Sequence, residues 1–177
     1  MNVSPAGFPA WSADGRTVYY VWDPFGREQI WKRAVSGGTP VQVMEIAAQS
    51  PHESPDGKWF YFYDQKASAI SRRPGSNGDV ERAEVVQVVA RRNRPQYNGW
   101  AVTDQEVVFI ALADSTHSAA IRAYSPGTGK IRSILDLSEV VVAGGDMSLS
   151  ISKDGGSILY TQLDRSTSNI IVAESSR

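Results

Sequence analysis

The chain has 177 residues, enough for one ordinary domain and too short for two of full size. Eighteen lysine and arginine residues against 19 aspartate and glutamate residues leave a net charge of −1, which gives no electrostatic signature for nucleic acid or anionic lipid. Cysteine is absent, which excludes disulfides, thiol nucleophiles and thiolate metal sites, while five Trp, seven Tyr and five Phe favour strands over helices.

The amino terminus, residues 1–7, has neither a basic region nor an apolar stretch, so it does not have the pattern of a signal peptide. The longest apolar run, Val107 to Ala113, is seven residues long. A transmembrane helix needs about 20 such residues. We therefore expect a soluble segment with no membrane partner.

A repeat of roughly 45 residues runs through the chain. Its landmark is an aspartate in a turn-forming cluster, which reads Ser-x-Asp-Gly in three copies and Val-Thr-Asp-Gln in the third, and the aspartates of the four copies are spaced 42, 48 and 50 residues apart. Such aspartates accept hydrogen bonds from nearby backbone N–H groups, so we expect them to form turns and not a calcium site. They are Asp14, Asp56, Asp104 and Asp154.

The sequence around each aspartate follows a common pattern. Positions four, five and six after it are apolar in all four copies, and an isoleucine follows 14 to 17 residues after it (Ile30, Ile70, Ile121 and Ile170). A Gly- or Pro-containing turn comes next, and the first three copies end in a further apolar segment. Each unit therefore predicts four short antiparallel strands joined by turns, which is a propeller blade.

We predict an all-β fold: a β-propeller of four-stranded antiparallel blades, with about four blades in one domain over residues 1–177. The third copy has Gln105 where the other copies have glycine, so a distorted hairpin is expected there. The predicted blades span approximately 8–46, 47–90, 97–137 and 146–174.

Residues 12–20, 54–62 and 152–160 resemble units of TolB-type, WD-repeat-like β-propellers. The ending, 157–174, is similar to the last blade of bacterial proteins in which a winged-helix transcription-regulator domain precedes such a propeller. The resemblance implies a docking platform, a lid on a prolyl-oligopeptidase-type hydrolase or, occasionally, a lyase. It also implies a bacterial source, with the periplasm and the cytoplasm both open as compartments.

Propellers of this family usually have about six blades. The fourth copy stops soon after its strand at 170–173, and the available strand donor at the amino terminus is short and contains Pro5. We therefore expect the chain to be the carboxy-terminal part of a larger ring, with a small closed four-blade disc as the alternative.

Residues that could carry chemistry are sparse. The Gly-x-Ser-x-Gly elbow of hydrolases is absent from the sequence, and His52 with Glu53 supplies two ligands where zinc or manganese needs three or four. Residues 91–94 with Tyr97 and Trp100 interleave cations and aromatics, but nearby acidic residues and the net charge oppose nucleic-acid binding. We expect no catalytic residue, no metal, no cofactor and no direct nucleic-acid contact.

The predicted binding site lies on the first strands of the units, which line the central channel in propellers of this type. Its residues are Trp11, His52, Glu53 and Trp100, with Trp100 in the same column as His52 when the copies are aligned on their aspartates. Aromatic anchors beside polar groups are typical of interaction surfaces.

These residues predict a non-catalytic scaffold that binds a protein, peptide or ligand at the channel mouth. We expect it to be the sensory or interaction module of a larger bacterial regulator or envelope protein. One alternative is an accessory domain of an enzyme, where His52 would serve a lyase site or the propeller would gate a hydrolase. Another is a repeat fragment with no independent role. The oligomeric state stays open.

Overall fold

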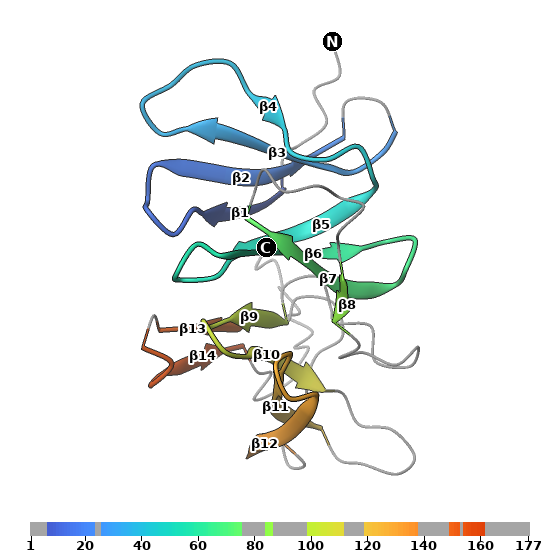
Figure 1. Ribbon diagram of the computed structural model, residues 1–177, viewed down its shortest axis with the longest axis vertical. Coiled ribbons are helices and arrows are strands. Elements are labelled where there is room, and N and C mark those ends of the chain that lie inside the picture. Colours follow the sequence, from blue (N-terminus) through green and yellow to red (C-terminus); the bar gives the residue numbers. More distant parts are fainter. Residues whose placement is uncertain are drawn as a thin grey trace, which may run out of the picture.

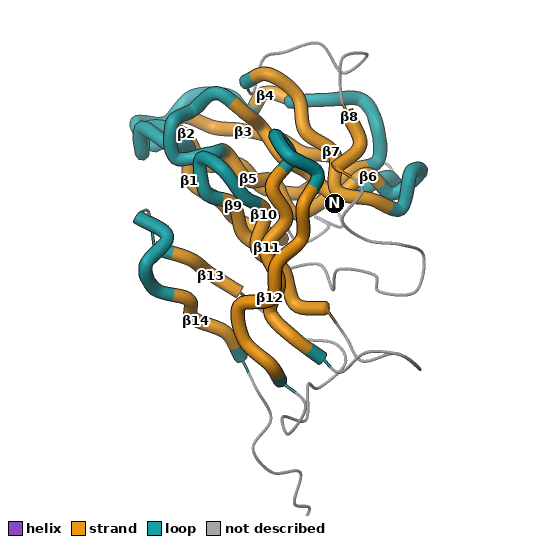
Figure 2. Tube along the Cα trace, turned by 60° about the horizontal axis from the view of Figure 1, so that its bottom comes forward, coloured by secondary structure: helices purple, strands orange, loops and turns teal. Residues whose placement is uncertain are grey.

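The computed structural model describes residues 7–23, 26–75, 84–86, 99–111, 119–137, 149–152 and 154–161, with the backbone alone at 84 and 85. These residues form strands and turns and no helix, as the Cα trace in Figure 2 shows. Among them is no helix of the length and hydropathy needed to cross a membrane. The predicted strand at 170–173, the cationic segment 91–94 with Tyr97, and most of the proposed strand donor lie outside the described residues.

Within the described ranges the strands form three four-stranded sheets and one two-stranded sheet, each with its strands in chain order and paired antiparallel. Short hairpin connections produce this order. Sheet 1 contains β1 (Gly7–Trp11), β2 (Thr17–Trp22), β3 (Gln29–Ala34) and β4 (Val41–Gln42). Sheet 2 contains β5 (Ala48–Glu53), β6 (Trp59–Asp64), β7 (Ala69–Pro74) and β8 (Glu84–Val86). Sheet 3 contains β9 (Trp100–Val102), β10 (Val107–Ala111), β11 (Ala120–Ser125) and β12 (Lys130–Asp136). Sheet 4 contains β13 (Leu149–Ile151) and β14 (Ile158–Tyr160).

The sheets follow one another along the long axis of the molecule, with sheet 1 at one end and sheets 3 and 4 at the other (Figure 1). Their first strands contact one another in succession, β1 with β5, β5 with β9 and β9 with β13. The first strands therefore form a common inner edge, as the blades of a propeller do.

Each sheet has two faces, which we call forward (towards the following sheet in the chain) and backward (towards the preceding one). Between sheets 1 and 2, the forward-facing Tyr19 meets the backward-facing Phe60 with ring centres 5.0 Å apart. Between sheets 2 and 3, Tyr61 packs with Trp100 and Phe109. A third apolar cluster joins sheets 3 and 4. The core is thus a series of layers between consecutive sheets.

The second strands of sheets 2 and 3 are buried on both faces. Residues 60–63 of β6 and all of β10 are buried, because each strand has a sheet packed on either side. Continuous apolar sequence, in place of alternation, is what such a position requires. The apolar run Trp59–Tyr63 therefore suits a strand that lies between two neighbouring sheets.

The first strands of sheets 1 and 2 share a bulge that the sequence analysis missed. The pairing of β1 with β2 shifts between Gly7 and Ala10, and that of β5 with β6 shifts between Gln49 and His52. At each bulge a residue adopts a left-handed conformation, Phe8 with φ 52° and Ser50 with φ 48°. An extra residue on one strand bends that strand and re-aims its side chains.

The hairpin that joins β9 to β10 is two residues shorter than its counterparts. Val102 pairs with Val107, leaving four residues between them, whereas Glu53 pairs with Phe60 and leaves six. When the copies are aligned on their aspartates, the strand residues before and after Asp104 are therefore each displaced by one position from their true counterparts in the other sheets. In the observed register Trp100 corresponds to Pro51 and not to His52.

Candidate binding site at the turn end of sheets 1 and 2

The Asp-Gly turns of sheets 1, 2 and 4 each contain the same pattern of local hydrogen bonds. In sheet 2 the Ser54 hydroxyl donates to Asp56 Oδ1 (2.7 Å), the same oxygen accepts from the Lys58 amide (3.1 Å), and Ser54 Oγ accepts from the Trp59 amide (3.0 Å). Gly57 adopts φ 70°, a conformation that favours glycine. The equivalent contacts recur around Ser12 with Asp14 and around Ser152 with Asp154.

The turn of sheet 3 differs, because its short hairpin leaves Asp104 outside this local network. Thr103 Oγ1 accepts from the amides of Gln105 (3.3 Å) and Glu106 (3.0 Å) in place of an aspartate. Asp104 Oδ1 instead accepts from the backbone N–H of Asp56 in sheet 2 (2.7 Å). Asp104 therefore links neighbouring sheets, whereas Asp14, Asp56 and Asp154 each stabilise their own turn.

Glu53 makes the corresponding link between sheets 2 and 1. It ends β5 and its carboxylate points backward, where Oε2 accepts from the Ala13 amide (2.6 Å) and Oε1 from the Tyr19 hydroxyl (3.3 Å). Two donors from a neighbouring sheet fix the position of this carboxylate. The side chain that the sequence placed at a channel mouth thus lies at the turn end of sheets 1 and 2.

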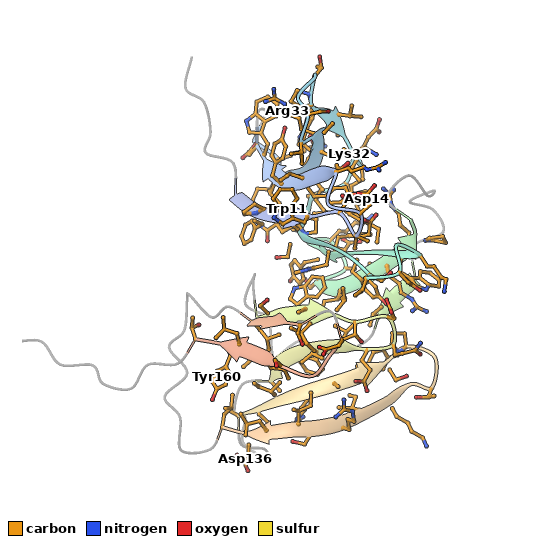
Figure 3. All side chains as sticks on the ribbon, turned by 90° about the vertical axis from the view of Figure 1, so that its left-hand side faces the viewer. Trp11, Asp14, Lys32, Arg33, Asp136 and Tyr160 are labelled. Atoms are coloured by element: carbon orange, nitrogen blue, oxygen red, sulfur yellow. The ribbon has the colours of Figure 1, made fainter. Side chains whose placement is uncertain are left out.

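A cleft of about 500 Å³ opens at this point between the two sheets. Tyr19 and Lys32 line it from sheet 1, and Glu53 and Asp56 line it from sheet 2. We call it the turn-end cleft, and Figure 3 shows Asp14 and Lys32 on its sheet 1 side. Its lining residues are Ser12, Ala13, Asp14, Thr17, Tyr19, Lys32, Glu53, Pro55, Asp56 and Gly57.

The two turn aspartates that line the cleft, Asp14 and Asp56, both have a lowered pKa. The Ser54 hydroxyl, together with Lys58, lowers the pKa of Asp56 to about 2. The Ser12 hydroxyl and the Arg16 amide lower the pKa of Asp14. Lys58 lies 2.9 Å from Asp56, so part of this charge is balanced at the exposed rim. With three carboxylates and Lys32, the cleft favours a cationic group in a ligand.

His52 and Glu53 project to opposite faces of β5, because successive residues of a strand alternate. His52 faces forward and its ring packs against that of Trp100 in a tilted contact, with ring centres 4.3 Å apart and ring planes at 58°. Removal from water lowers the pKa of His52 to about 4, so its imidazole is neutral at pH 7. The pair therefore does not converge on one metal ion, and the described residues contain no group of three or more His, Asp or Glu side chains placed to hold one.

Trp100 is fully buried between sheets 2 and 3 and lines no mouth, so the predicted placement of its side chain is wrong. The reason is the shortened hairpin after β9, which turns the indole towards Tyr61 and Ile70. Trp11 is exposed, at 62% of its surface. It pairs with Val18 on the backward face of sheet 1, away from the turn-end cleft side of that sheet.

Tyr19 and Lys32 are the cleft residues that the sequence analysis missed. They pair with each other across β2 and β3, so both lie on the forward face of sheet 1. Tyr19 stands in one of the three apolar columns, and that column signals burial without showing that the hydroxyl reaches Glu53. Lys32 follows the Ile30 landmark by two residues, a spacing that places both on one face and carries no functional signal of its own.

A second cleft, of about 660 Å³, lies between sheets 3 and 4. Its floor is apolar, with Ile121, Ile134 and Ile158, and its rim carries the Glu106–Arg132 ion pair at 2.6 Å. The Arg132 guanidinium lowers the pKa of Glu106. That pair lies within one sheet and leaves the cleft mainly apolar.

The fold is that of TolB-like β-propellers. TolB from Acinetobacter baumannii superposes with a TM-score of 0.65 at 17% identity, over 86% of this chain and 36% of that one. A putative TolB from Agrobacterium tumefaciens gives 0.62 at 16% identity, over 93% and 61%. A chain of the nidogen/laminin complex gives 0.63 at 10% identity, over 89% and 56%. No family model matches the chain, and no curated protein matches it either.

These likenesses confirm the predicted propeller fold. The four sheets are blades, and the chain spans about a third to three fifths of the length of the TolB structures. Puromycin hydrolase and an oligogalacturonate lyase share the fold, so the fold is compatible with both binding proteins and enzymes.

Proposed function

We propose that this propeller is a non-catalytic scaffold that binds a cationic segment of a protein or peptide in the turn-end cleft. The observation that carries the proposal is the fixed Glu53 carboxylate, held by Ala13 and Tyr19 at the wall of a 500 Å³ cleft. A carboxylate already oriented by the scaffold binds a lysine or arginine side chain at low entropic cost.

We further propose that the scaffold is the interaction module of a larger bacterial regulator or envelope protein. The envelope setting rests on the resemblance of residues 12–20, 54–62 and 152–160 to TolB-type units, and the similarity of the fold to TolB structures from two bacteria is in line with a bacterial source. The regulator setting rests on the resemblance of residues 157–174, most of which lie outside the described residues. The identity of any adjoining domain tests this: a winged helix favours a regulator, and a hydrolase domain opposes the non-catalytic role.

The binding proposal is tested with two fluorescently labelled peptides, one ending in three lysines and the other in three glutamates. Fluorescence anisotropy should show that the lysine peptide binds and the glutamate peptide does not. Glu53→Gln removes the charge but keeps a similar shape: its Oε1 can accept from the Ala13 amide, and its NH2 group can donate to the Tyr19 hydroxyl oxygen. This variant should weaken binding roughly tenfold. Added salt should weaken binding further.

Asp136→Asn is the matched control, because it removes the same charge from the far end of the molecule (Figure 3). Its affinity for the lysine peptide should equal that of the unmodified chain. Equal binding of the two peptides, no binding of either, or an equal loss in both variants would contradict the proposal.

A further inference from the structure

The backward face of sheet 1 is an aromatic surface that no described sheet covers. Val18 and Tyr20 lie on it because Tyr19 and Val21, which alternate with them, pack forward against sheet 2. Trp11 pairs with Val18 and is 62% exposed. The face also carries Trp22 and Trp31, which meet edge to face at 5.1 Å.

The same register positions are interface positions in every following sheet. There they face the preceding sheet and belong to the apolar clusters or, at Glu53, bond to it. Trp11 corresponds to Glu53, Val102 and Ile151; Val18 to Phe60, Val107 and Ile158; Tyr20 to Phe62, Phe109 and Tyr160.

The forward face of sheet 4 carries the complementary half of this interface. Ile158 and Tyr160 pack against sheet 3, so Leu159 between them points away from it and is 76% exposed. Leu159 corresponds to Tyr19, Tyr61 and Val108. Each of those residues packs against the backward face of the next sheet.

The two exposed faces lie at different ends of the same molecule. Sheet 4 makes its strand contacts with sheet 3, and Figure 1 shows sheet 1 at the opposite end of the long axis. One chain in this conformation therefore cannot bring Leu159 onto Trp11, whereas a second copy can.

We propose that the occupant of the backward face of sheet 1 is the forward face of sheet 4 from a second copy of the chain. The contact is head to tail, with Leu159 of one copy seated among Trp11, Val18 and Tyr20 of the other. Such a heterologous contact repeats an interface that the chain already uses three times internally, and it forms a ring or an extended chain of copies. The proposal goes beyond peptide binding and does not depend on it.

The test measures the mass of the 177-residue chain by analytical ultracentrifugation across a wide range of protein concentration. The unmodified chain should associate as concentration rises. Trp11→Glu and Leu159→Glu should each weaken association about tenfold or more, because each places an unpaired charge in an apolar contact. Both side chains are exposed, so the variants should retain the strand circular dichroism and melting temperature of the unmodified chain. Val35→Glu, at another exposed apolar position, is the control and should associate normally.

Mixing the two variants identifies the geometry. A head-to-tail contact leaves one intact pairing in the mixture, Trp11 of the Leu159→Glu chain with Leu159 of the Trp11→Glu chain, so the mixture should form a two-copy species that neither variant forms alone. A face-to-face contact between two sheets 1 would respond to Trp11→Glu only and would show no rescue. That result, or a chain that is monomeric at every concentration, would overturn the proposal.

Discussion

The backward side of the β2–β3 pair in sheet 1 faces no described sheet, whereas the same side of the equivalent β6–β7 pair in sheet 2 packs against sheet 1. Phe60 and Phe62 of sheet 2 are fully buried, whereas Val18 and Tyr20 at the same positions of sheet 1 are partly exposed. An arginine follows the same rule: Arg73 is 1% exposed between sheets and Arg33 is on the surface. The comparison shows that a position on the backward face of a blade is buried when a preceding sheet packs against it, for apolar residues and for an arginine alike.

The largest expected effect comes from truncating aromatic side chains at equivalent positions of sheets 1 and 2. Phe62→Ala should reduce the free energy of unfolding by about 3–5 kcal/mol, because it leaves a cavity between sheets 1 and 2. Tyr20→Ala should cost about 1 kcal/mol in the dilute, monomeric chain, since its side chain is less closely packed. Urea denaturation of both variants checks this difference, and equal losses of stability would remove the distinction between the two faces.

The arginine pair offers a second comparison. Arg73 donates to the Val43 carbonyl (3.2 Å) and its guanidinium lies 5.5 Å from the centre of the Phe60 ring. Arg73→Met should reduce stability by about 2 kcal/mol, since a carbonyl between the sheets loses its charged donor. Arg33→Met should change stability by less than about 0.5 kcal/mol. Thermal and urea unfolding measure both, and a larger loss of stability at Arg33 would contradict the assignment of faces.

His52 makes the interface of sheets 2 and 3 sensitive to acid. Its pKa of about 4 in the folded chain lies below the ordinary value of 6.5. The unfolded chain therefore binds the proton first, and stability present above pH 6.5 is lost as the pH falls to 4. The loss should be on the order of 2–3 kcal/mol.

The control for this prediction is His52→Gln, which has no imidazole to titrate. Unfolding free energies of the two proteins, measured from about pH 7 to pH 4, should differ progressively across that window as the unmodified chain loses the His52 contribution. Parallel curves would show that His52 has an ordinary pKa and is not held between the sheets.

The smallest effect separates the two kinds of hairpin. Gly57→Ala should cost about 1 kcal/mol, because an L-residue is strained at φ 70°. The added methyl group itself would meet Ala13 at an ordinary 3.9 Å. Gln105→Ala in the shorter hairpin should stay within about 0.5 kcal/mol of the unmodified chain. Differential scanning calorimetry distinguishes these outcomes. A larger loss of stability for Gln105→Ala than for Gly57→Ala would contradict the assignment of the left-handed conformation to Gly57.

The repeat, the antiparallel strands and the double-sided burial of the second strands were predictable because they depend on residue spacing and apolar content. The register around Asp104 was not predictable in this way. Gln105 in place of glycine indicated a distorted hairpin in the third copy, but it did not show that this hairpin is two residues shorter, which moves Trp100 out of the column of His52. A one-residue change of register reverses the face to which a strand side chain points.

For the site residues, too, the sequence indicated the residue type but not the contacts or the face of the sheet. Glu53 could be selected as a polar residue on a first strand, but its bonds to Ala13 and Tyr19 depend on how closely sheets 1 and 2 pack. Trp11 could be selected as an exposed aromatic, but the face it occupies follows from its pairing with Val18. The bulge at Ser50 had one overlooked signal in the sequence. Ser50 and its counterpart Phe8 each stand directly before a proline and six positions before the aspartate of their copy.

The central claim is that the forward face of each sheet packs against the backward face of the following sheet, and NOE spectroscopy of the labelled chain tests it most directly. We expect cross-peaks between the rings of Tyr19 and Phe60, whose centres are 5.0 Å apart, and between those of His52 and Trp100, whose centres are 4.3 Å apart. Cross-peaks from Phe60 to Trp100, with none between Phe60 and Tyr19, would show that the strands of sheet 2 face the other way and would contradict the account.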